Sequence, residues 1–403
     1  MTKKIPSSYG FFERSLNRTM VVVALCMILY HVLIVWYPMF GELMNQNTHL
    51  GFCLVILILQ GARTSAKTWK RITHIVALPV CLALVIYMAL HYERLDMESG
   101  FPEPRDVVVG VLLMSAVLWL TWRSFGAIFP VMVLCAVAYA LWGHHIPGVM
   151  NHPPFEFGYI VSNLSVGFQG IYGMLLNVSV NILFLLVIFG SIFEATGVTR
   201  FFLELGTLFS RHLKGGAGQT AIFSSSFVGM ANGVAVANVA ITGSFTIPVM
   251  KKSGFPGACA GAIEAMASTG GQLTPPIMGI AVFIMANFLG ISYTDLMVKA
   301  LVPAMAYYIT AVLGVMLIAS REEIPLSKAP VNKRALAFGA PVFVLPMGVL
   351  TAIMLLHYSP GYAAFWAILT LLLVSFLRAE TRPTTAAVIE NLAKGAVMGA
   401  TFW

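Results

Sequence analysis

The chain has 403 residues, of which 59% are hydrophobic and only 10% are charged, and its mean hydropathy is +0.86. Soluble domains contain about 25% charged residues, so this composition excludes an ordinary soluble protein. The net charge of +8 does not indicate nucleic-acid binding, because the basic residues gather in alternate connections between apolar runs. Long apolar runs recur and no barrel-type alternation does, so we expect an all-α polytopic membrane protein.

Five membrane-spanning helices are predicted in the first 158 residues. Their ranges are 19–38, 51–59, 72–90, 107–122 and 125–142. The second range is short for a span, but the alternation of charge between connections requires a crossing there. Lys and Arg precede the first span and follow the second and fourth, whereas residues 41–50 and 143–158 contain neither. The positive-inside rule therefore predicts a multi-pass protein of the bacterial inner membrane with a cytoplasmic N-terminus.

No cofactor or protein-bound metal centre is predicted from the cysteines and histidines. The five cysteines lie in apolar runs without paired spacing, which favours packing residues over metal ligands or disulfides. His31, His74 and His91 lie singly near span ends, where structural roles are expected. The linker 143–159 contains three histidines but no cysteine and a single acid, so a proline-rich extracytoplasmic connection is favoured over a metal site.

The second region, residues 159–403, begins with polar sequence. Residues 160–174 are rich in Gly and Ser and are predicted to form an interfacial or arm helix. This helix leads into a predicted span at 175–195. Basic residues between 200 and 214 then return the chain to the cytoplasm.

Residues 215–250 are predicted to form a re-entrant helical hairpin. Two basic residues precede this segment and two follow it, so both of its ends lie on one side of the membrane. Asn232-Gly233 is a strong turn signal and marks the expected tip. Backbone that bends within a membrane is tolerated only where it packs in protein or lines an aqueous cavity, so the tip predicts a binding site. Alternatively, the Ser, Thr and Gly residues serve only helix packing, since Gly229–Gly233 is a GxxxG pattern.

Residues 255–290 are predicted to form a crossing helix that is broken in its middle. The break, Ser268–Pro276, contains two Gly and two Pro, which remove helix hydrogen bonds and free carbonyl groups for a cation. A second half-helix is expected to begin near Pro275, where its positive dipole end can meet an anion. Paired broken elements near the membrane midplane are typical of secondary transporters.

Glu264 lies within this broken helix and is the only acid between Glu204 and Asp295. Carboxylates inside a membrane are costly and are therefore functional candidates. We expect Glu264 either to carry a proton or to be a hydrogen-bonded packing residue that faces the break.

Three segments of the second region carry a family resemblance: Ala235–Val239, Thr242–Lys252 and Glu264–Pro276. Together they resemble the large membrane subunit of tripartite ATP-independent periplasmic (TRAP) transporters. The chain is most similar to the fused form that works with TAXI-type substrate-binding proteins, and the first 158 residues look like the fused small subunit. The resemblance is strong from residue 178 to residue 308.

The resemblance implies an elevator-type carrier. In that family, scaffold helices hold a transport domain of inverted repeats, and each repeat contains a hairpin and a broken helix. The substrate, usually an organic acid, arrives on a soluble periplasmic protein, and sodium usually drives its import. The implied partners of this chain are thus a TAXI-type binding protein, a small organic acid and membrane lipid.

The resemblance also implies roles for individual residues. A cation would lie between hairpin and break, at Asn232, Gly233, Asn238, Thr269, Gly270, Gly271 and Thr274. The substrate would contact hydroxyl and amide groups of Ser225, Ser226, Thr242 and Gln272. The family's Ser-Gly-Ser at the hairpin tip is replaced here by Asn232-Gly233-Val234. Because two hydroxyls are lost, sodium and a proton both stay open as the coupling ion, with Glu264 as the proton carrier.

A second departure from the family lies near the C-terminus. Residues 335–357 and 362–377 look like the opening of a second repeat, which begins near residue 331, but no second hairpin or broken helix follows before residue 403. We therefore expect a longer polypeptide or another chain to complete the repeat. Two other functions stay open, a non-transporting scaffold or assembly component and a permease of another hairpin-containing ion-transporter family. No enzyme is expected, because the spans contain no cluster of catalytic residues.

Overall fold

The computed structural model describes almost the whole chain as helices and connections. The described residues are 11–37, 40–65, 67–98, 100–167, 169–324, 326, 330–378 and 381–401, and all regular structure within them is helical. Seven helices in these ranges are long and apolar enough to cross a membrane. The predicted class, an all-α polytopic membrane protein, is confirmed.

Contacts divide the chain into two compact units. One consists of residues 1–184 and 396–403, and the other of residues 185–395. This division falls inside a helix, between Phe184 and Leu185. The domain boundary predicted after residue 158, which rests on the family resemblance, stays a prediction.

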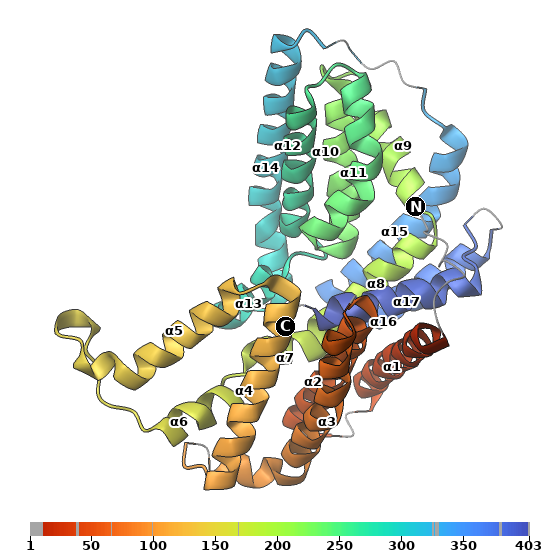
Figure 1. Cartoon of the computed structure of the whole chain (residues 1–403). Helices are drawn as coiled ribbons and strands as arrows, with labels where there is room; N and C mark the ends of the chain where they lie inside the picture. Colours follow the sequence, from red (N-terminus) through yellow and green to blue (C-terminus); the bar gives the residue numbers. More distant parts are fainter. Residues whose placement is uncertain are drawn as a thin grey trace. The chain divides into compact units, whose positions relative to one another are not determined.

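The first unit contains the five helices expected from the apolar runs (Figure 1). They are α1 (Phe11–Trp36), α2 (Glu42–Thr64), α3 (Thr68–Met97), α4 (Pro104–Phe125) and α5 (Ile128–Trp142). The second helix is much longer than its predicted range, because polar residues before that range are buried and hydrogen-bonded. Asn47 donates to the carbonyl oxygen of Val85 at 2.9 Å and accepts from the Tyr172 hydroxyl at 2.9 Å. Polar side chains that are satisfied in this way continue a buried helix.

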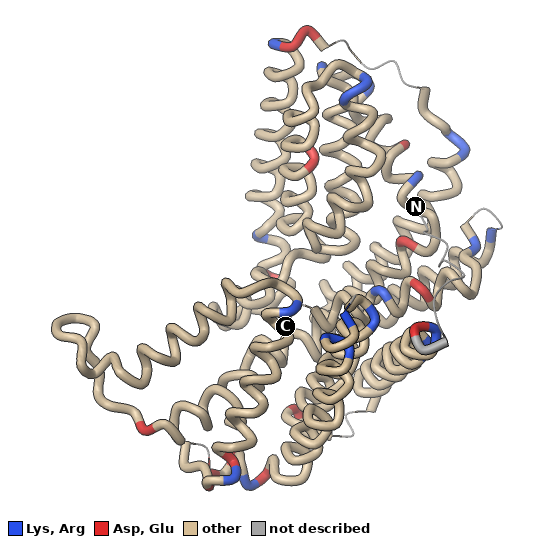
Figure 2. Tube along the Cα trace, viewed as in Figure 1, with Lys and Arg blue, Asp and Glu red and all other residues tan. Residues whose placement is uncertain are grey.

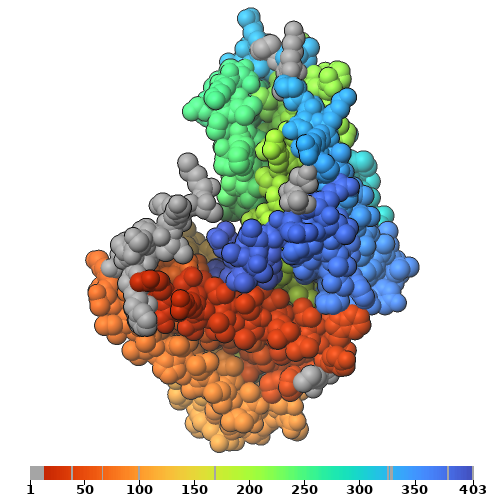
Figure 3. Space-filling model, turned by 90° about the vertical axis from the view of Figure 1, so that its right-hand side faces the viewer, coloured from red at the N-terminus to blue at the C-terminus, as the bar shows by residue number. Residues whose placement is uncertain are grey.

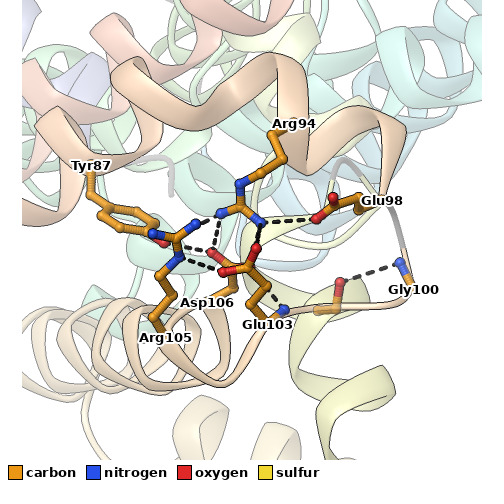
Figure 4. Close-up of polar contacts among 8 residues, drawn as sticks. Tyr87, Arg94, Glu98, Gly100, Glu103, Arg105 and Asp106 are labelled. Atoms are coloured by element: carbon orange, nitrogen blue, oxygen red, sulfur yellow. Dashed lines mark hydrogen bonds and ion pairs between the residues drawn. The ribbon is translucent and has the colours of Figure 1, made fainter.

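A cluster of charges ties the ends of α3 and α4 together (Figure 4). The carboxylate of Asp106 is fully buried and accepts from both terminal nitrogens of Arg94, at 2.6 and 2.9 Å. It also accepts from the Tyr87 hydroxyl at 2.6 Å and from the backbone N–H of Glu103 at 3.0 Å. Arg94 donates further to Glu98 at 2.9 Å. The buried negative charge is therefore matched by a positive charge and by complete hydrogen bonding.

Short helices and tight turns connect α5 to the next long helix. They are η1 (Gly143–His145), η2 (Gly148–Met150), α6 (Phe157–Val161) and the π-helical η3 (Ser162–Val166). The interfacial helix predicted over 160–174 is thus shorter and begins earlier. Gly170 explains its end, since a Cβ atom there would lie 2.1 Å from the carbonyl oxygen of Leu164. The span predicted at 175–195 is confirmed as a continuous helix, formed by α7 (Met174–Val178), η4 (Ser179–Leu183) and α8 (Phe184–Ala195).

The second unit is built around the predicted hairpin and broken helix. Its elements are α9 (Thr199–Ser210), α10 (Gly216–Asn232), α11 (Ala235–Lys252), α12 (Gly257–Gly270), η5 (Gly271–Leu273), α13 (Ile280–Leu289) and α14 (Tyr293–Arg321), followed by α15 (Lys333–Leu355), α16 (Pro360–Phe376) and the part of α17 (Thr385–Ala400) before residue 396. Figure 1 shows α10, α11, α12 and α14 side by side with roughly parallel axes. In Figure 3 the blue segments of α15 and α16 lie on the surface, and α15 packs on α16.

Small residues allow the helices of this second bundle to pack closely. Ala221, Ala260 and Ala267 are completely buried in a core shared by α10, α12 and α14. Figure 2 shows that charged residues lie mostly at the ends of helices. Small side chains at helix contacts and charges at helix ends are the pattern of a membrane bundle.

Helix α9 was not predicted from the sequence. It lies along α10, and the Ser224 hydroxyl donates to the carbonyl oxygen of Phe202 at 3.1 Å. Gly206 makes this approach possible, because a Cβ atom there would lie 2.2 Å from the Ser224 hydroxyl oxygen. The hairpin therefore has a helix packed along its first arm.

Candidate functional site: the hairpin and the broken helix

The hairpin turns where the sequence predicts. Helix α10 ends at Asn232, and Gly233 adopts a left-handed conformation with φ of 65°. The Gly233 N–H donates to the carbonyl oxygen of Gly229 at 2.8 Å, and the Asn232 side chain accepts from the Val234 N–H at 3.1 Å. Glycine adopts this backbone conformation without steric cost, and the asparagine closes the turn with its own side chain.

The helical break is also confirmed, but its second half begins later than predicted. Helix α12 ends at Gly270, and α13 starts at Ile280, not near Pro275. The Tyr293 hydroxyl donates to the carbonyl oxygen of Pro276 at 2.7 Å and accepts from the Met278 N–H at 3.2 Å. These bonds hold the backbone outside a helix, so the positive end of the second half-helix lies at Ile280.

The hairpin and the break meet through their backbones. A Cβ atom on Gly229 would lie 2.4 Å from the Cα atom of Gly271, and one on Gly271 would lie 2.6 Å from the Cα atom of Gly229. At the tip, a Cβ atom on Gly233 would lie 2.8 Å from the carbonyl oxygen of Met278. No side chain fits at these points, so glycine permits the contact between the two bent elements.

Asn238 links the two arms of the hairpin beside this contact. Its side chain is fully buried and donates to the carbonyl oxygen of Ser225 at 2.7 Å. Its amide nitrogen lies 3.1 Å from the position that a Cβ atom on Gly229 would occupy. Of the residues expected to bind a cation, Asn238 and Gly271 are therefore neighbours.

Glu264 lies on α12, contacts α10 and α11, and is fully buried. Its Oε1 atom accepts from the hydroxyls of Ser225 at 2.9 Å and Ser268 at 3.1 Å, and also from Thr242. Its Oε2 atom accepts from the Thr246 hydroxyl. We call this set of four hydroxyls the hydroxyl cage. Its members come from α10, α11 and α12, so the carboxyl group joins both hairpin arms to the broken helix.

Thr246 and Ser268 were not identified as site residues from the sequence. Each lies four positions after another member of the site, Thr246 after Thr242 and Ser268 after Glu264. Residues four apart on a helix share a face. This spacing is the signal that could have identified them.

Other residues predicted to bind the cation face away from the hairpin. Thr269 is exposed and donates to the carbonyl oxygen of Ala265. Thr274 donates to the carbonyl oxygen of Gly270 at 2.9 Å and lies 3.1 Å from the Tyr308 hydroxyl on α14. A Cβ atom on Gly270 would lie 2.5 Å from the ring of Tyr307. This side of the break is packed on α14.

The residues predicted to bind substrate are likewise not gathered in one place. Ser225 and Thr242 belong to the hydroxyl cage. The Ser226 hydroxyl donates to the carbonyl oxygen of Phe223 in its own helix, and Gln272 is exposed. Their roles in substrate binding stay predictions.

The linker histidines show no arrangement suited to metal binding. Within the described ranges, no group of three or more His, Cys, Asp or Glu residues could hold a metal ion. The two ring nitrogens of His152 lie 2.7 Å from the carbonyl oxygen of Pro153 and 3.0 Å from that of Tyr139. Carbonyl oxygens thus occupy both coordinating positions of this ring.

Comparisons with known proteins identify a matching family model and two relatives of this chain. The family model described as tripartite ATP-independent periplasmic transporter, DctM component, matches residues 107–402. An uncharacterized protein of Sinorhizobium fredii is 26% identical over 218 residues, which cover 53% of this chain and 52% of that protein. A protein of Haemophilus influenzae, provisionally named TRAP transporter large permease protein, is 27% identical over 117 residues, 29% of this chain and 27% of that protein. The chain therefore spans about half or less of the length of these relatives.

Proposed function

Because the chain belongs to the DctM family of tripartite ATP-independent periplasmic transporter permeases, we propose that it imports small organic acids as part of a secondary active transporter. The observation that carries the proposal is the backbone contact between the hairpin and the helical break, at Gly229 and Gly271. Two bent elements that meet inside a bundle bring non-helical backbone and half-helix ends together. Secondary transporters bind substrates and ions with such groups.

The partner proposed for this permease is a soluble periplasmic binding protein of the TAXI type. Family membership supports a periplasmic binding protein in general, and the three sequence segments in the second region support the TAXI type. We propose that the first 158 residues act as the fused small subunit. The N-terminus would then be cytoplasmic, and the protein would reside in the inner membrane.

We propose an elevator-type movement of the hairpin and broken helix, driven by a cation gradient. In this proposal residues 215–290 represent the first repeat, and residues 331–403 would open the second repeat. Of the proposed cation residues, Gly233 and Gly271 lie at the hairpin–break contact, and Asn238 lies beside Gly271. Sodium and a proton are the two coupling ions that fit the sequence.

The test is uptake of labelled mono- and dicarboxylates into proteoliposomes that contain the complete natural polypeptide and its binding protein. A sodium gradient and a pH gradient are imposed in separate arms. We expect uptake in one arm, and we expect Gly271→Ala to abolish it, because the added methyl group would collide with Gly229. Gly261→Ala is the matched control, since no atom lies within 4 Å of a Cβ atom at that position.

Two results would contradict this proposal. The first is a folded wild-type protein that takes up no carboxylate in either arm. The second is full uptake by Gly271→Ala and by Asn238→Ala, which would indicate that the hairpin serves only packing in a scaffold protein.

A further inference from the structure

The hydroxyl cage around Glu264 contains donors but no cation. Ser225, Thr242, Thr246 and Ser268 contact the carboxyl oxygens. No ion pair of Glu264 with Lys, Arg or His occurs among the described residues. A carboxylate without a cationic partner is costly to bury, so the charge of Glu264 must be removed or stabilised in another way.

The cage can hold the carboxyl group in two protonation states. Each hydroxyl can donate one hydrogen and can also accept. In the ionised state, all four hydroxyls can donate to Glu264. In the protonated state, the O–H group of Glu264 can donate to Thr246, which then donates to the carbonyl oxygen of Thr242 at 3.0 Å. Thr242 has a similar second acceptor, the carbonyl oxygen of Asn238 at 2.8 Å.

Within the described part of the chain, the surrounding elements add no other titratable group to the cage. Helix α10 contributes Ser225, and α11 contributes Thr242 and Thr246. On α14, which packs against α12, the Tyr307 hydroxyl donates to the carbonyl oxygen of Met266, and Tyr308 bonds to Thr274. Glu264 is therefore the group in this cluster that can gain or lose a proton.

We propose that Glu264 carries the coupling proton, and that its protonation stabilises the hairpin docked on the broken helix. This inference rests on the proposed transport function and chooses the proton over sodium. The three hairpin hydroxyls belong to α10 and α11, whereas Glu264 and Ser268 belong to α12. Separation of these helices would expose the carboxyl group to water, where it can ionise and release the proton on that side. One proton binds a carboxylate oxygen of Glu264 and forms its O–H bond, and on the other side of the membrane this bond breaks and the proton passes to water.

Sodium coupling is the rival outcome for the same cage. All contacts of the carboxyl oxygens are with hydroxyls at hydrogen-bonding distance. A proton therefore fits the closed cage, whereas a metal ion would have to displace its hydrogen bonds.

The first experiment needs no substrate. Infrared difference spectra of the purified chain are recorded between acidic and alkaline buffer, and the probe is the carbonyl-stretch band of a protonated carboxylic acid. We expect a band in wild type that Glu264→Gln removes and that Glu322→Gln, a change at an exposed acid of the same unit, leaves in place. A wild-type spectrum that matches the Glu264→Gln spectrum at every pH would overturn the proposal.

The second experiment uses the complete transporter in proteoliposomes, with the carboxylate that wild type takes up. Glu264→Gln keeps the size and the hydrogen-bond acceptor of the side chain but cannot ionise. We expect it to lose accumulation driven by a pH gradient in sodium-free buffer, while exchange of labelled for unlabelled substrate, which moves no net proton, continues. Thr246→Val should shift the pH dependence of accumulation, and Thr310→Val, at an exposed threonine of α14, should not.

The outcomes separate this inference from the proposed function. Accumulation by Glu264→Gln in a pH gradient, or accumulation by wild type that requires sodium and ignores pH, would overturn the proton role while transport stands. Absence of all uptake and exchange in wild type would instead contradict the transport function. The infrared band would then still decide whether Glu264 holds a proton.

Discussion

Among the residues that the structure describes, each unit buries one carboxyl group completely, and the two groups are stabilised in different ways. In the first unit, Asp106 accepts two hydrogen bonds from the guanidinium group of Arg94 (Figure 4). In the second unit, Glu264 is surrounded by the hydroxyl cage and has no cationic contact among the described residues. A guanidinium group cannot accept a hydrogen bond, and its positive charge favours the ionised form of Asp106.

The comparison separates a structural carboxylate from one that can change its state. The Arg94 cluster ties together the ends of α3 and α4, and a change of protonation would break it. The hydroxyl cage lies where α10, α11 and α12 meet, and it can be rearranged without loss of its hydrogen bonds. A buried acid that lacks a cation is therefore the stronger functional candidate of the two.

The largest expected effect is the loss of the cation beside Asp106. Arg94→Ala leaves a buried, uncompensated negative charge and should lower the free energy of unfolding by about 3 kcal/mol. The measurement is the unfolding of the purified chain in detergent, followed by circular dichroism. Arg105→Ala is the control, because its side chain is 55% exposed and its ion pair with Glu103 should contribute about 1 kcal/mol or less. Equal effects of the two changes would contradict the structural role of Arg94.

Replacing each buried carboxyl group by an amide tests the comparison directly. Asp106→Asn removes the buried counter-charge of Arg94, which keeps its ion pairs with Glu98 and Glu103, and should cost about 2–3 kcal/mol of unfolding free energy. Glu264→Gln leaves no stranded charge and keeps an acceptor for the hydroxyls, so about 1 kcal/mol or less is expected. A larger loss for Glu264→Gln than for Asp106→Asn would show that the cage depends on a full negative charge.

The glycine contact predicts opposite signs for two alanine substitutions. Gly229→Ala would force a methyl group against Gly271 and should destabilise the chain by about 1–3 kcal/mol. Gly261→Ala adds a methyl group in open space on helix α12 and should stabilise it by up to about 1 kcal/mol. Thermal unfolding of the three proteins in the same detergent measures both effects. Two changes of the same sign would argue against a close contact at Gly229.

Local chemistry explains which features the sequence could predict. The turn at Asn232-Gly233 needs a residue that accepts positive φ, and the break at 271–279 contains two prolines and two glycines. Both features are determined by residues that are close together in the sequence. Glu264 could be identified because a lone acid in an apolar stretch is unusual.

Features that depend on distant contacts could not be predicted. For residues 200–214 the sequence predicts only a return of the chain to the cytoplasm. Helix α9 forms there because its apolar side packs on α10, a contact that the local sequence does not specify. Helix α13 begins at Ile280 and not near Pro275, because the Tyr293 hydroxyl bonds to the preceding backbone. The Thr274 hydroxyl contacts Tyr308 on α14. The local sequence does not predict which side of the break packs on that helix.

A single hydrogen bond of the hydroxyl cage reports the charge of Glu264. Ser268→Ala removes one hydroxyl from Oε1, which keeps its bonds to Ser225 and Thr242. A hydrogen bond to a neutral acid contributes about 1 kcal/mol, whereas a bond to a charged group contributes about 1.5–3 kcal/mol. If the docked hairpin holds a protonated Glu264, Ser268→Ala should cost about 1 kcal/mol in neutral buffer.

The control for this change is Ser115→Ala, since Ser115 is exposed and donates only to its own helix. Its unfolding free energy should match that of wild type within about 0.5 kcal/mol. The difference between the two variants is then followed as the buffer is made alkaline. This difference should rise toward about 1.5–3 kcal/mol if Glu264 loses its proton. The hydrogen bond that Ser268→Ala removes is then a bond to a full negative charge. A cost near 3 kcal/mol in neutral buffer would mean that Glu264 is already ionised in the closed cage.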